Sequence, residues 1–367
     1  MDTPRPLGSA HHDGPNERAG DEAARPLLPT WFPVRPTPRM SSFVRRHRQR
    51  ITPLAGPADV RWCYRLLLGR EPDAHGLRGY RDLIAHNAVT RDELVGYFIS
   101  SPEFRGRLNH AYGNREGAPV GTPVGELTIY VDPDDSVIGS FLRKSGTYEP
   151  DVTNVIRRHL KRGQTFVDCG ASFGYFSSLA GSIVGSEGVV ISLEPGPQNQ
   201  SLLLLNLITN GVTTAEVHQV AISDRPGILR YGRSGGNGTV LEFDGDPGQI
   251  GRYDLVRAVT LDSIVGTRRI DMMKVDVEGA EGRVFRGATE TLSRCTPILV
   301  FEFSPPSLEA TSEMSGEELL RHLEGLGYSI DVIDRRGEDL QRRSVAELLS
   351  RFDDESGDHI DLVAWAT

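Results

Sequence analysis

The chain has 367 residues, more than one ordinary domain needs, and this length suits two domains with tails. Its formal net charge of -9 argues against nonspecific binding to nucleic acid, because a phosphate backbone attracts a basic surface. The three cysteines lie far apart, as in a reduced cytoplasmic protein, and no apolar run approaches the roughly 18 residues of a membrane span. We therefore expect a cytoplasmic protein that neither spans a membrane nor binds nucleic acid.

The first part of the chain divides into a tail and a helical domain. Residues 1–50 are rich in Pro, Arg, Gly and Asp and show little periodicity, so we predict a disordered tail. Residues 55–110 follow a helical pattern instead. Apolar side chains recur there at helical spacing in Val60, Cys63, Tyr64 and Leu67.

Local signals divide this second segment into several helices. Residues 69–73 contain Gly and Pro and interrupt the first helix. Thr90 and Glu93 have the spacing of a capping box, which starts a later helix. Ser101 followed by Pro102 is typical of the N-terminus of a fourth helix. The sequence therefore predicts a small all-α domain over residues 55–110.

The helical segment resembles a small bacterial domain of unknown function that is often attached to cell-surface and glycan-related proteins. The matching residues are Gly69, Arg70, Pro72, Asp73, Gly76, Leu77, Phe98, Ser101, Glu103 and Phe104. Their types indicate a turn, helix caps and a core rather than catalysis. We interpret the domain as a scaffold or a module that docks a partner.

The rest of the chain, after a predicted linker at residues 111–124, is an α/β domain over residues 125–367. Strand-like runs lie at 127–131, 165–169, 189–194, 214–222, 271–277, 298–303, 328–333 and 360–366. Helical stretches lie between them at 151–162, 175–184, 198–210, 282–293 and 316–326. Such alternation predicts a doubly wound, mostly parallel, Rossmann-like sheet.

The loop after the strand at 165–169 has the character of a nucleoside-cofactor site. The strand runs into Asp168, and Gly170 and Gly174 then allow the backbone to approach a ligand closely. The loop lacks the G-x-G-x-x-G spacing of dinucleotide binders and the Gly-Lys-Ser/Thr of a phosphate-binding loop. A carboxylate at Asp168 repels a pyrophosphate but suits the amino group and sulfonium of S-adenosylmethionine (SAM).

Two further positions extend the predicted cofactor site. Glu194 follows the next strand, where an acid can accept hydrogen bonds from both ribose hydroxyls. Ser223 and Asp224 follow a later strand, in a turn that commonly sits beside the adenine. A plain β-turn explains that second position equally well.

An acidic string from Met273 to Glu281 is the second chemical feature. Asp276, Glu278 and Glu281 crowd the end of an apolar strand, where they repel one another unless they are protonated, hydrogen-bonded or bound to a cation. Lys274 is a candidate ion-pair partner for them. Glu302 lies in a very apolar run, so it either faces a cleft or is costly to bury.

Together these residues resemble the FkbM-type methyltransferases over about two thirds of the chain. The likeness is carried by Tyr148, Glu149, Pro150, residues 168–174, Glu194, Pro195, Asp262, residues 274–281, Gly287, Ala288 and Glu302. The resemblance implies a SAM-dependent enzyme, usually an O-methyltransferase acting on hydroxyls of sugars, glycans or secondary metabolites. It also implies that Glu149 and Ser172 contact the cofactor, although the family often has Asn at the position of Ser172.

Several hypotheses about the chemistry follow. Asp276 or Glu278 takes the proton from the acceptor hydroxyl, or orients that hydroxyl. A magnesium site built from Asp276, Glu278 and Glu302 is an alternative. We expect a small-molecule or glycan acceptor, allow for a homo-oligomer, and place residues 231–239 in a loop that either lies beside the acceptor or is a plain surface loop.

Two other function classes stay open at this stage. One is a noncatalytic SAM-binding or scaffold protein that docks through its helical domain. The other is a nicotinamide oxidoreductase, against which the missing dinucleotide fingerprint argues.

Overall fold

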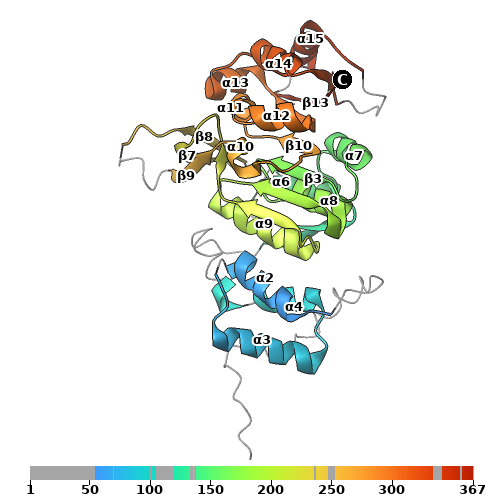
Figure 1. Ribbon diagram of the computed structural model, residues 1–367, viewed down its shortest axis with the longest axis vertical. Coiled ribbons are helices and arrows are strands. Elements are labelled where there is room, and N and C mark those ends of the chain that lie inside the picture. The colour runs from blue at the N-terminus through green and yellow to red at the C-terminus, as the bar shows by residue number, and fades with distance from the viewer. Residues whose placement is uncertain are drawn as a thin grey trace, which may run out of the picture. The chain divides into compact units, whose positions relative to one another are not determined.

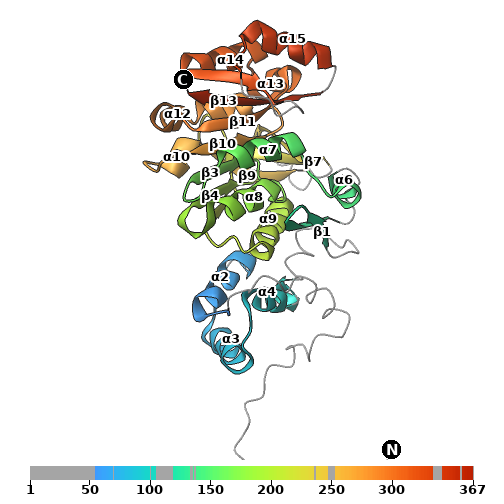
Figure 2. The ribbon, with the colours of Figure 1, turned by 90° about the vertical axis from the view of Figure 1, so that its right-hand side faces the viewer.

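The computed structural model describes residues 54–68, 70–99, 101–104, 119–132, 135, 138–234, 237–246, 253–333, 341–355 and 358–366. The predicted tail at residues 1–50 lies outside these ranges, as does the first part of the predicted linker. Figures 1 and 2 show the chain from two sides. Among the described residues, no helix is both long enough and apolar enough to cross a membrane.

The N-terminal domain is all-helical, as predicted. Its helices are α2 (Pro57–Leu68), α3 (Ala74–Asn87) and α4 (Arg91–Ile99). The predicted capping box is present, because the Thr90 N–H donates to Glu93 and the Glu93 N–H donates to Thr90. The expected fourth helix begins at Pro102, and only its start is described.

The core of this domain explains several residues of its sequence signature. The Phe98 ring stacks on Tyr80 at 4.4 Å and meets Tyr64 edge-on at 5.1 Å between ring centroids. Arg70 lies over the Tyr64 ring and donates two hydrogen bonds, of 2.6 and 2.8 Å, to Glu103. Asp73 caps α3 by accepting hydrogen bonds from the start of that helix. These contacts are structural, and a role of this domain as a scaffold or docking module stays a prediction.

The α/β domain contains a sheet with the order β12-β13-β11-β10-β3-β4-β5, seven strands in the described part of the chain. Their bounds are β12 (Tyr328–Val332), β13 (Ile360–Ala366), β11 (Ile298–Phe303), β10 (Met272–Val275), β3 (Thr165–Cys169), β4 (Val189–Leu193) and β5 (Ala215–His218). β13 runs antiparallel to both of its neighbours, and the other neighbouring pairs are parallel. The predicted doubly wound, mostly parallel sheet is therefore confirmed.

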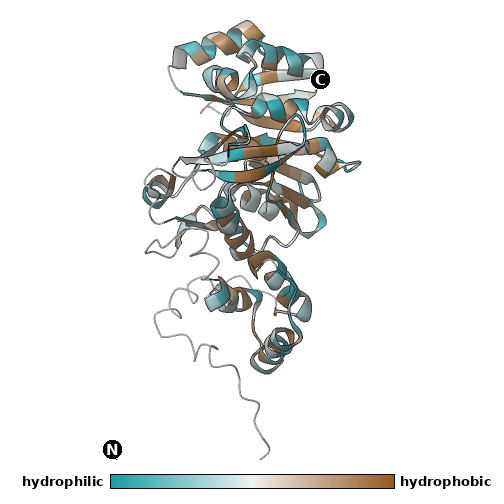
Figure 3. Ribbon diagram, turned by 90° about the vertical axis from the view of Figure 1, so that its left-hand side faces the viewer, coloured by the Kyte–Doolittle hydropathy of each residue, from teal (hydrophilic) through white to brown (hydrophobic). Residues whose placement is uncertain are grey.

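Helices cover both faces of this sheet. Alternate side chains of a strand point to opposite faces, so one strand can contribute to two apolar clusters. Val167 of β3 belongs to one buried apolar cluster and Phe166 to the other. The first cluster includes side chains of α10 (Leu261–Val265), α11 (Glu281–Arg286), α12 (Thr289–Cys295), α13 (Pro305–Ser312), α14 (Gly316–Gly325) and α15 (Val345–Glu355). The second includes side chains of α6 (Ile138–Ser145), α7 (Pro150–His159), α8 (Tyr175–Val184) and α9 (Pro197–Thr209). A short 3₁₀ turn, η1 (Gly185–Glu187), follows α8. Figure 3 shows the apolar residues along the strands and on the helix sides that pack against them.

Two smaller sheets flank the main one and were not expected. β6 (Ala221–Ile222), β9 (Asp254–Val259), β7 (Gly227–Ser234) and β8 (Asn237–Glu242) form a sheet in the order β6-β9-β7-β8. β1 (Val120–Val124) and β2 (Leu127–Val131) form a hairpin.

The structure corrects four boundaries drawn from the sequence. The predicted linker contains β1, and the predicted loop at 231–239 is largely the β7–β8 hairpin. The run 214–222 is broken into β5 and β6, which belong to different sheets. The helical stretch 282–293 is broken into α11 and α12 at Gly287, where a Cβ would lie 2.1 Å from the Ser223 carbonyl oxygen. Close backbone approaches of this kind leave no mark in hydrophobic periodicity.

The order of the strands places a ligand site at one edge of the main sheet. β4 follows β3 on one side, whereas the later strands β10 and β11 lie on the other. The direction of the winding therefore changes between β3 and β10, and open α/β sheets bind ligands at the carboxyl ends of the strands beside such a switch point. The loops that follow β3, β4 and β10 begin at this edge.

Candidate active site

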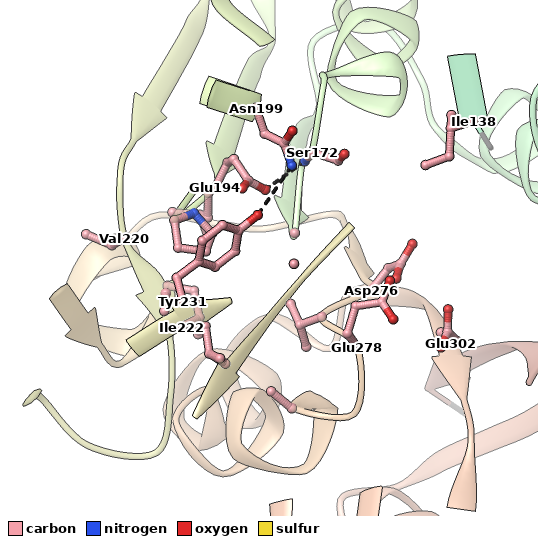
Figure 4. Close-up of a pocket in the computed structure, with 18 of the residues that line it drawn as sticks. Ile138, Ser172, Glu194, Asn199, Val220, Ile222, Tyr231, Asp276, Glu278 and Glu302 are labelled. Carbon is pink, nitrogen blue, oxygen red and sulfur yellow. Dashed lines mark hydrogen bonds between the residues drawn. The ribbon is translucent and has the colours of Figure 1, made fainter. Parts of the chain in front are cut away.

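A cavity of about 240 Å³ lies at the carboxyl ends of β3, β4 and β10. Figure 4 shows Ser172, Glu194, Asn199 and Tyr231 together at one end, and Asp276, Glu278 and Glu302 together at the other. Of the residues predicted to bind the cofactor, Glu149, Gly170, Ser172 and Glu194 line the cavity. Both candidate catalytic residues, Asp276 and Glu278, line it as well.

Glu194 is buried and held by two backbone donors. The Ser172 N–H donates to its Oε2 at 2.9 Å, and the Gly196 N–H donates to its Oε1 at 2.7 Å. Burial raises the pKa of Glu194 to about 7, against the effect of these bonds. The Asn199 side chain also hydrogen-bonds to Glu194, and since a carboxylate has about four acceptor sites, Glu194 keeps acceptor capacity.

Tyr231 is a wall residue of the cavity that the sequence did not reveal. A Cβ on Gly238 would lie 2.0 Å from the Tyr231 hydroxyl, and one on Gly196 would lie 2.6 Å from it. The two glycines thus leave the space that the buried ring occupies. Asn199 donates a long hydrogen bond of 3.5 Å to the same hydroxyl. The Gly-rich stretch at residues 231–239 is the signal in the sequence, and it predicts a loop.

The two loop glycines have different roles. Gly170 has a φ of 80°, and a Cβ there would lie 1.8 Å from the Asp276 carbonyl oxygen. It therefore lets the β3 and β10 loops meet at the cavity. Gly174 has a φ of 85° and precedes α8, where a Cβ would lie 2.5 Å from Leu203 of α9. Gly174 permits helix packing and is not part of the cavity wall.

Asp168 is not brought to the cavity wall. It is fully buried in β3, and its Oδ2 accepts a hydrogen bond of 2.6 Å from the Ser177 hydroxyl. Its Oδ1 has no hydrogen-bond partner among the described residues. Burial raises the pKa of Asp168, while the charge of Lys274, its cross-strand neighbour in β10, lowers it. Asp168 therefore does not line the cavity, and its part in cofactor binding would be indirect.

The predicted adenine-side residues also lie off the wall. The Ser223 N–H donates to the Val259 carbonyl, and the Ser223 hydroxyl donates to Asp224 at 3.1 Å. The cavity is lined instead by Ala221 and Ile222, which come just before them. The alternative of a plain turn at Ser223 and Asp224 therefore fits the structure better.

Lys274 and Asp276 form a largely buried ion pair at the end of β10. Lys274 is 4% exposed, and its Nζ lies 2.7 Å from Asp276 Oδ2 and 4.5 Å from the centre of the Phe176 ring. Burial opposes the charge of Lys274, but the carboxylates of Asp276 and Glu149 raise its pKa above the ordinary value. Lys274 is thus an ion-pair partner of the acidic string, as the sequence suggested.

The other two acids of the string, Glu278 and Glu281, have different roles. Glu281 is buried, and its Oε1 accepts hydrogen bonds from the backbone N–H groups of Val277 at 2.9 Å and Gly279 at 3.4 Å. It therefore fixes the loop. Glu278 lines the cavity with a φ of 56°, an uncommon conformation for a residue with a side chain. Burial, followed by the charge of Asp276, raises the pKa of Glu278.

Three further acids complete this end of the cavity. Glu149 precedes α7, and burial raises its pKa to about 7. Glu302 of β11 is paired in register with Asp361 of β13, and both line the cavity. Burial, with the charge of Asp276 next, raises the pKa of Glu302 to about 10. Asp361, an acid within the predicted strand at 360–366, was not among the predicted site residues.

The same acids do not form a recognisable metal centre. Among the described residues, no group of three or more His, Cys, Asp and Glu side chains is placed to hold a metal ion. The magnesium hypothesis for Asp276, Glu278 and Glu302 therefore gains no support from their arrangement.

Comparisons with known families define the class of protein. Residues 168–330 match the family model described as "Methyltransferase FkbM domain", and residues 59–108 match "Domain of unknown function (DUF4214)". This chain therefore carries a methyltransferase domain of the FkbM family, preceded by a DUF4214 domain. Both resemblances inferred from the sequence are confirmed, and the nicotinamide alternative is not. A comparison with curated proteins finds no match.

Solved structures with a similar chain course include several methyltransferases. Methyltransferase FkbM from Methylobacillus flagellatus KT is 16% identical with a TM-score of 0.36, and the match covers 83% of this chain and 58% of that one. A SAM-dependent O-methyltransferase from Thermotoga maritima is 15% identical with a TM-score of 0.34, covering 60% and 66%. A putative rRNA-methylase from Clostridium thermocellum is 10% identical with a TM-score of 0.36, covering 59% and 93%.

Proposed function

We propose that this protein transfers the methyl group of SAM to a hydroxyl of a sugar, glycan or secondary metabolite. The observation that carries the proposal is the pairing, in one cavity, of a nucleoside-type end around Glu194 with an acidic end around Asp276 and Glu278. A hydroxyl is a weak nucleophile that needs a proton acceptor, and the acidic end supplies one.

The cavity wall fits SAM. Glu194 has acceptor capacity for the ribose hydroxyls, and the Tyr231 ring and Ile222 offer apolar surface to the adenine. Gly170 and Ser172 would pass beneath the amino-acid part, and Glu149 would face its ammonium group. When bound, SAM supplies an electrophilic methyl group on a sulfonium, and most of the rate then comes from aligning the nucleophile with it.

Glu278 and Asp276 have different parts in this proposal. The Asp276 carboxylate is held by Lys274, so it is suited to orienting the acceptor hydroxyl. Burial raises the pKa of Glu278, which makes its carboxylate a stronger base, and its backbone has an uncommon conformation beside the loop that Glu281 fixes. We therefore propose that Glu278 is the base that accepts the proton of the acceptor hydroxyl.

The test uses purified full-length chain, labelled SAM and a panel of sugars and hydroxylated metabolites. Glu278→Gln should lower turnover by about 100-fold or more while leaving SAM affinity within about threefold. Asp276→Asn should lower turnover less. Full turnover in both variants would contradict the assignment.

The noncatalytic alternative has its own observable outcome. SAM binding without methyl transfer to any member of the panel would favour a scaffold that docks through the helical domain. Docking by that domain, self-association and a cytoplasmic location stay predictions from the sequence.

A further inference from the structure

The two ends of the cavity differ in charge. Five acids line the end beside β10, and we call them the acidic end: Glu149, Asp276, Glu278, Glu302 and Asp361. Among the described residues of the cavity wall, none is Lys or Arg. Lys274 lies behind the wall, and its charge offsets that of Asp276 at 2.7 Å. The acidic end therefore either carries a net negative charge or holds some of its carboxyl groups in the protonated form.

Glu302 and Asp361 show how such protons are held. They are directly opposite each other in the β11–β13 pairing, and both side chains reach the cavity. Carboxyl groups opposite each other in neighbouring strands cannot both ionise at little cost, so such a pair retains one proton over a wide pH range. Because burial also raises the pKa of both carboxyl groups, the doubly ionised pair is disfavoured.

Titratable groups face this region from every neighbouring element. They are Tyr148 and Glu149 before α7, Asp151 on α7, Asp168 on β3, Lys274 on β10, Asp276 and Glu278 in the loop after β10, Glu281 at the start of α11, Glu302 on β11, and His359 and Asp361 at β13. Burial raises the pKa of Glu149, Glu278, Glu302 and Asp361 alike. A cation among these acids would lower those pKa values and release protons, whereas a neutral molecule would not.

We propose that the acidic end distinguishes the methyl donor from its demethylated product by charge, favouring the sulfonium cation of SAM over the neutral thioether of S-adenosylhomocysteine. The inference rests on the proposed function, since it requires SAM in this cavity. The two molecules share their nucleoside and amino-acid parts, so Glu194 and Tyr231 treat them alike. They differ by one methyl group and one positive charge, and the acids that respond to that charge lie beyond the nucleoside end.

The discrimination has a consequence for turnover. Once the methyl group leaves, the sulfonium becomes neutral and its attraction to the acidic end disappears. The product then binds more weakly than the donor, so donor replaces product without a change in the fold. An arrangement of this kind limits product inhibition.

The test is calorimetric titration of the full-length chain with SAM and, separately, with S-adenosylhomocysteine, in buffers of different ionisation enthalpy. SAM should bind about tenfold more tightly than S-adenosylhomocysteine at about pH 8, with a smaller preference at about pH 6. Binding of SAM should release more protons than binding of S-adenosylhomocysteine. Equal affinities with equal proton release would overturn the inference while leaving the proposed function intact. Failure of both molecules to bind would overturn both.

A double variant assigns the effect to its residues. Glu302→Gln with Asp361→Asn removes the shared charge and keeps the shapes of both side chains. It should retain the affinity for S-adenosylhomocysteine, which shows that it is folded, and lose several-fold of the preference for SAM. Glu309→Gln, an exposed acid on α13, is the matched control and should change neither affinity. An unchanged preference in the double variant would contradict the role of this pair.

Discussion

Lys274 Nζ lies 2.7 Å from Asp276 Oδ2, and the pair connects the buried interior of the main sheet to the wall of the cavity. Lys274 lies in β10, opposite Asp168 of β3, while Asp276 is the first residue after the strand. The cation is almost fully buried, whereas the Asp276 side chain keeps 24% of its exposure. One ion pair thus connects packing within the sheet to the chemistry at its edge.

Removing the cation should be costly. Lys274→Met leaves Asp276 partly buried without its partner, so we expect a loss of about 3 kcal/mol in the free energy of unfolding. Lys161→Met, at an exposed lysine, should cost far less. Chemical denaturation measures both, and adding Asp276→Asn to Lys274→Met should restore part of the loss. If it restores nothing, the ion pair does not explain the burial of Lys274.

Gly170 should tolerate no side chain. Gly170→Ala adds a Cβ 1.8 Å from the Asp276 carbonyl oxygen, so the two loops must separate and SAM affinity should fall by at least tenfold. Gly211→Ala is a matched control, because its φ of 70° is similar but nothing lies within 4 Å of the added atom. It should cost only about 1 kcal/mol of stability and leave SAM affinity unchanged. Equal effects of the two substitutions on SAM affinity would count against a close approach at Gly170.

The Tyr231 ring, rather than its hydroxyl, should matter for the cofactor. Tyr231→Phe keeps the ring and removes the hydroxyl with its long hydrogen bond to Asn199, so SAM affinity should change by less than about twofold. Tyr231→Ala removes the wall itself and should weaken SAM binding by about tenfold, with a lower melting temperature. Titration and thermal unfolding distinguish the two variants, and a large loss in Tyr231→Phe would show that the hydroxyl is the contact.

Buried acids should make stability fall as the pH rises. Glu194 and Glu281 each have a pKa near 7 in the folded chain, above the ordinary value of 4.5, because burial disfavours their charge. The folded state therefore binds more protons than the unfolded state between these values, and the free energy of unfolding decreases from about pH 4.5 to about pH 7. Glu281→Gln should make that decrease shallower, as measured by denaturation across the range. A decrease of the same steepness would show that Glu281 titrates normally.

The strands and their alternation with helices could be predicted from the sequence. Apolar runs such as 298–303 coincide with strands because both faces of the sheet are covered, and the alternation with helices fixes the doubly wound arrangement. Glu194, Asp276 and Glu278 were found because each lies at the carboxyl end of a predicted strand. At the ends of parallel strands, sequence position alone predicts that side chains meet.

Side-chain direction and long-range neighbours were not readable. Asp168 also ends a strand, but it points into packing with Ser177 rather than toward the cavity. Tyr231 and Asp361 reach the cavity from a second sheet and from the last strand, whose positions depend on tertiary contacts. Hydrophobic patterning specifies burial, and it carries no information on which distant loop a residue will face.

The most direct measurement is the affinity of the full-length chain for SAM, determined by calorimetric titration beside that of Glu194→Gln. We expect SAM to bind to the wild-type chain, and Glu194→Gln, which keeps the shape of the side chain but loses its charge, to bind at least tenfold more weakly with its fold intact. NAD should not bind to either. Absence of SAM binding, or equal affinity in the variant, would contradict the placement of the cofactor in this cavity.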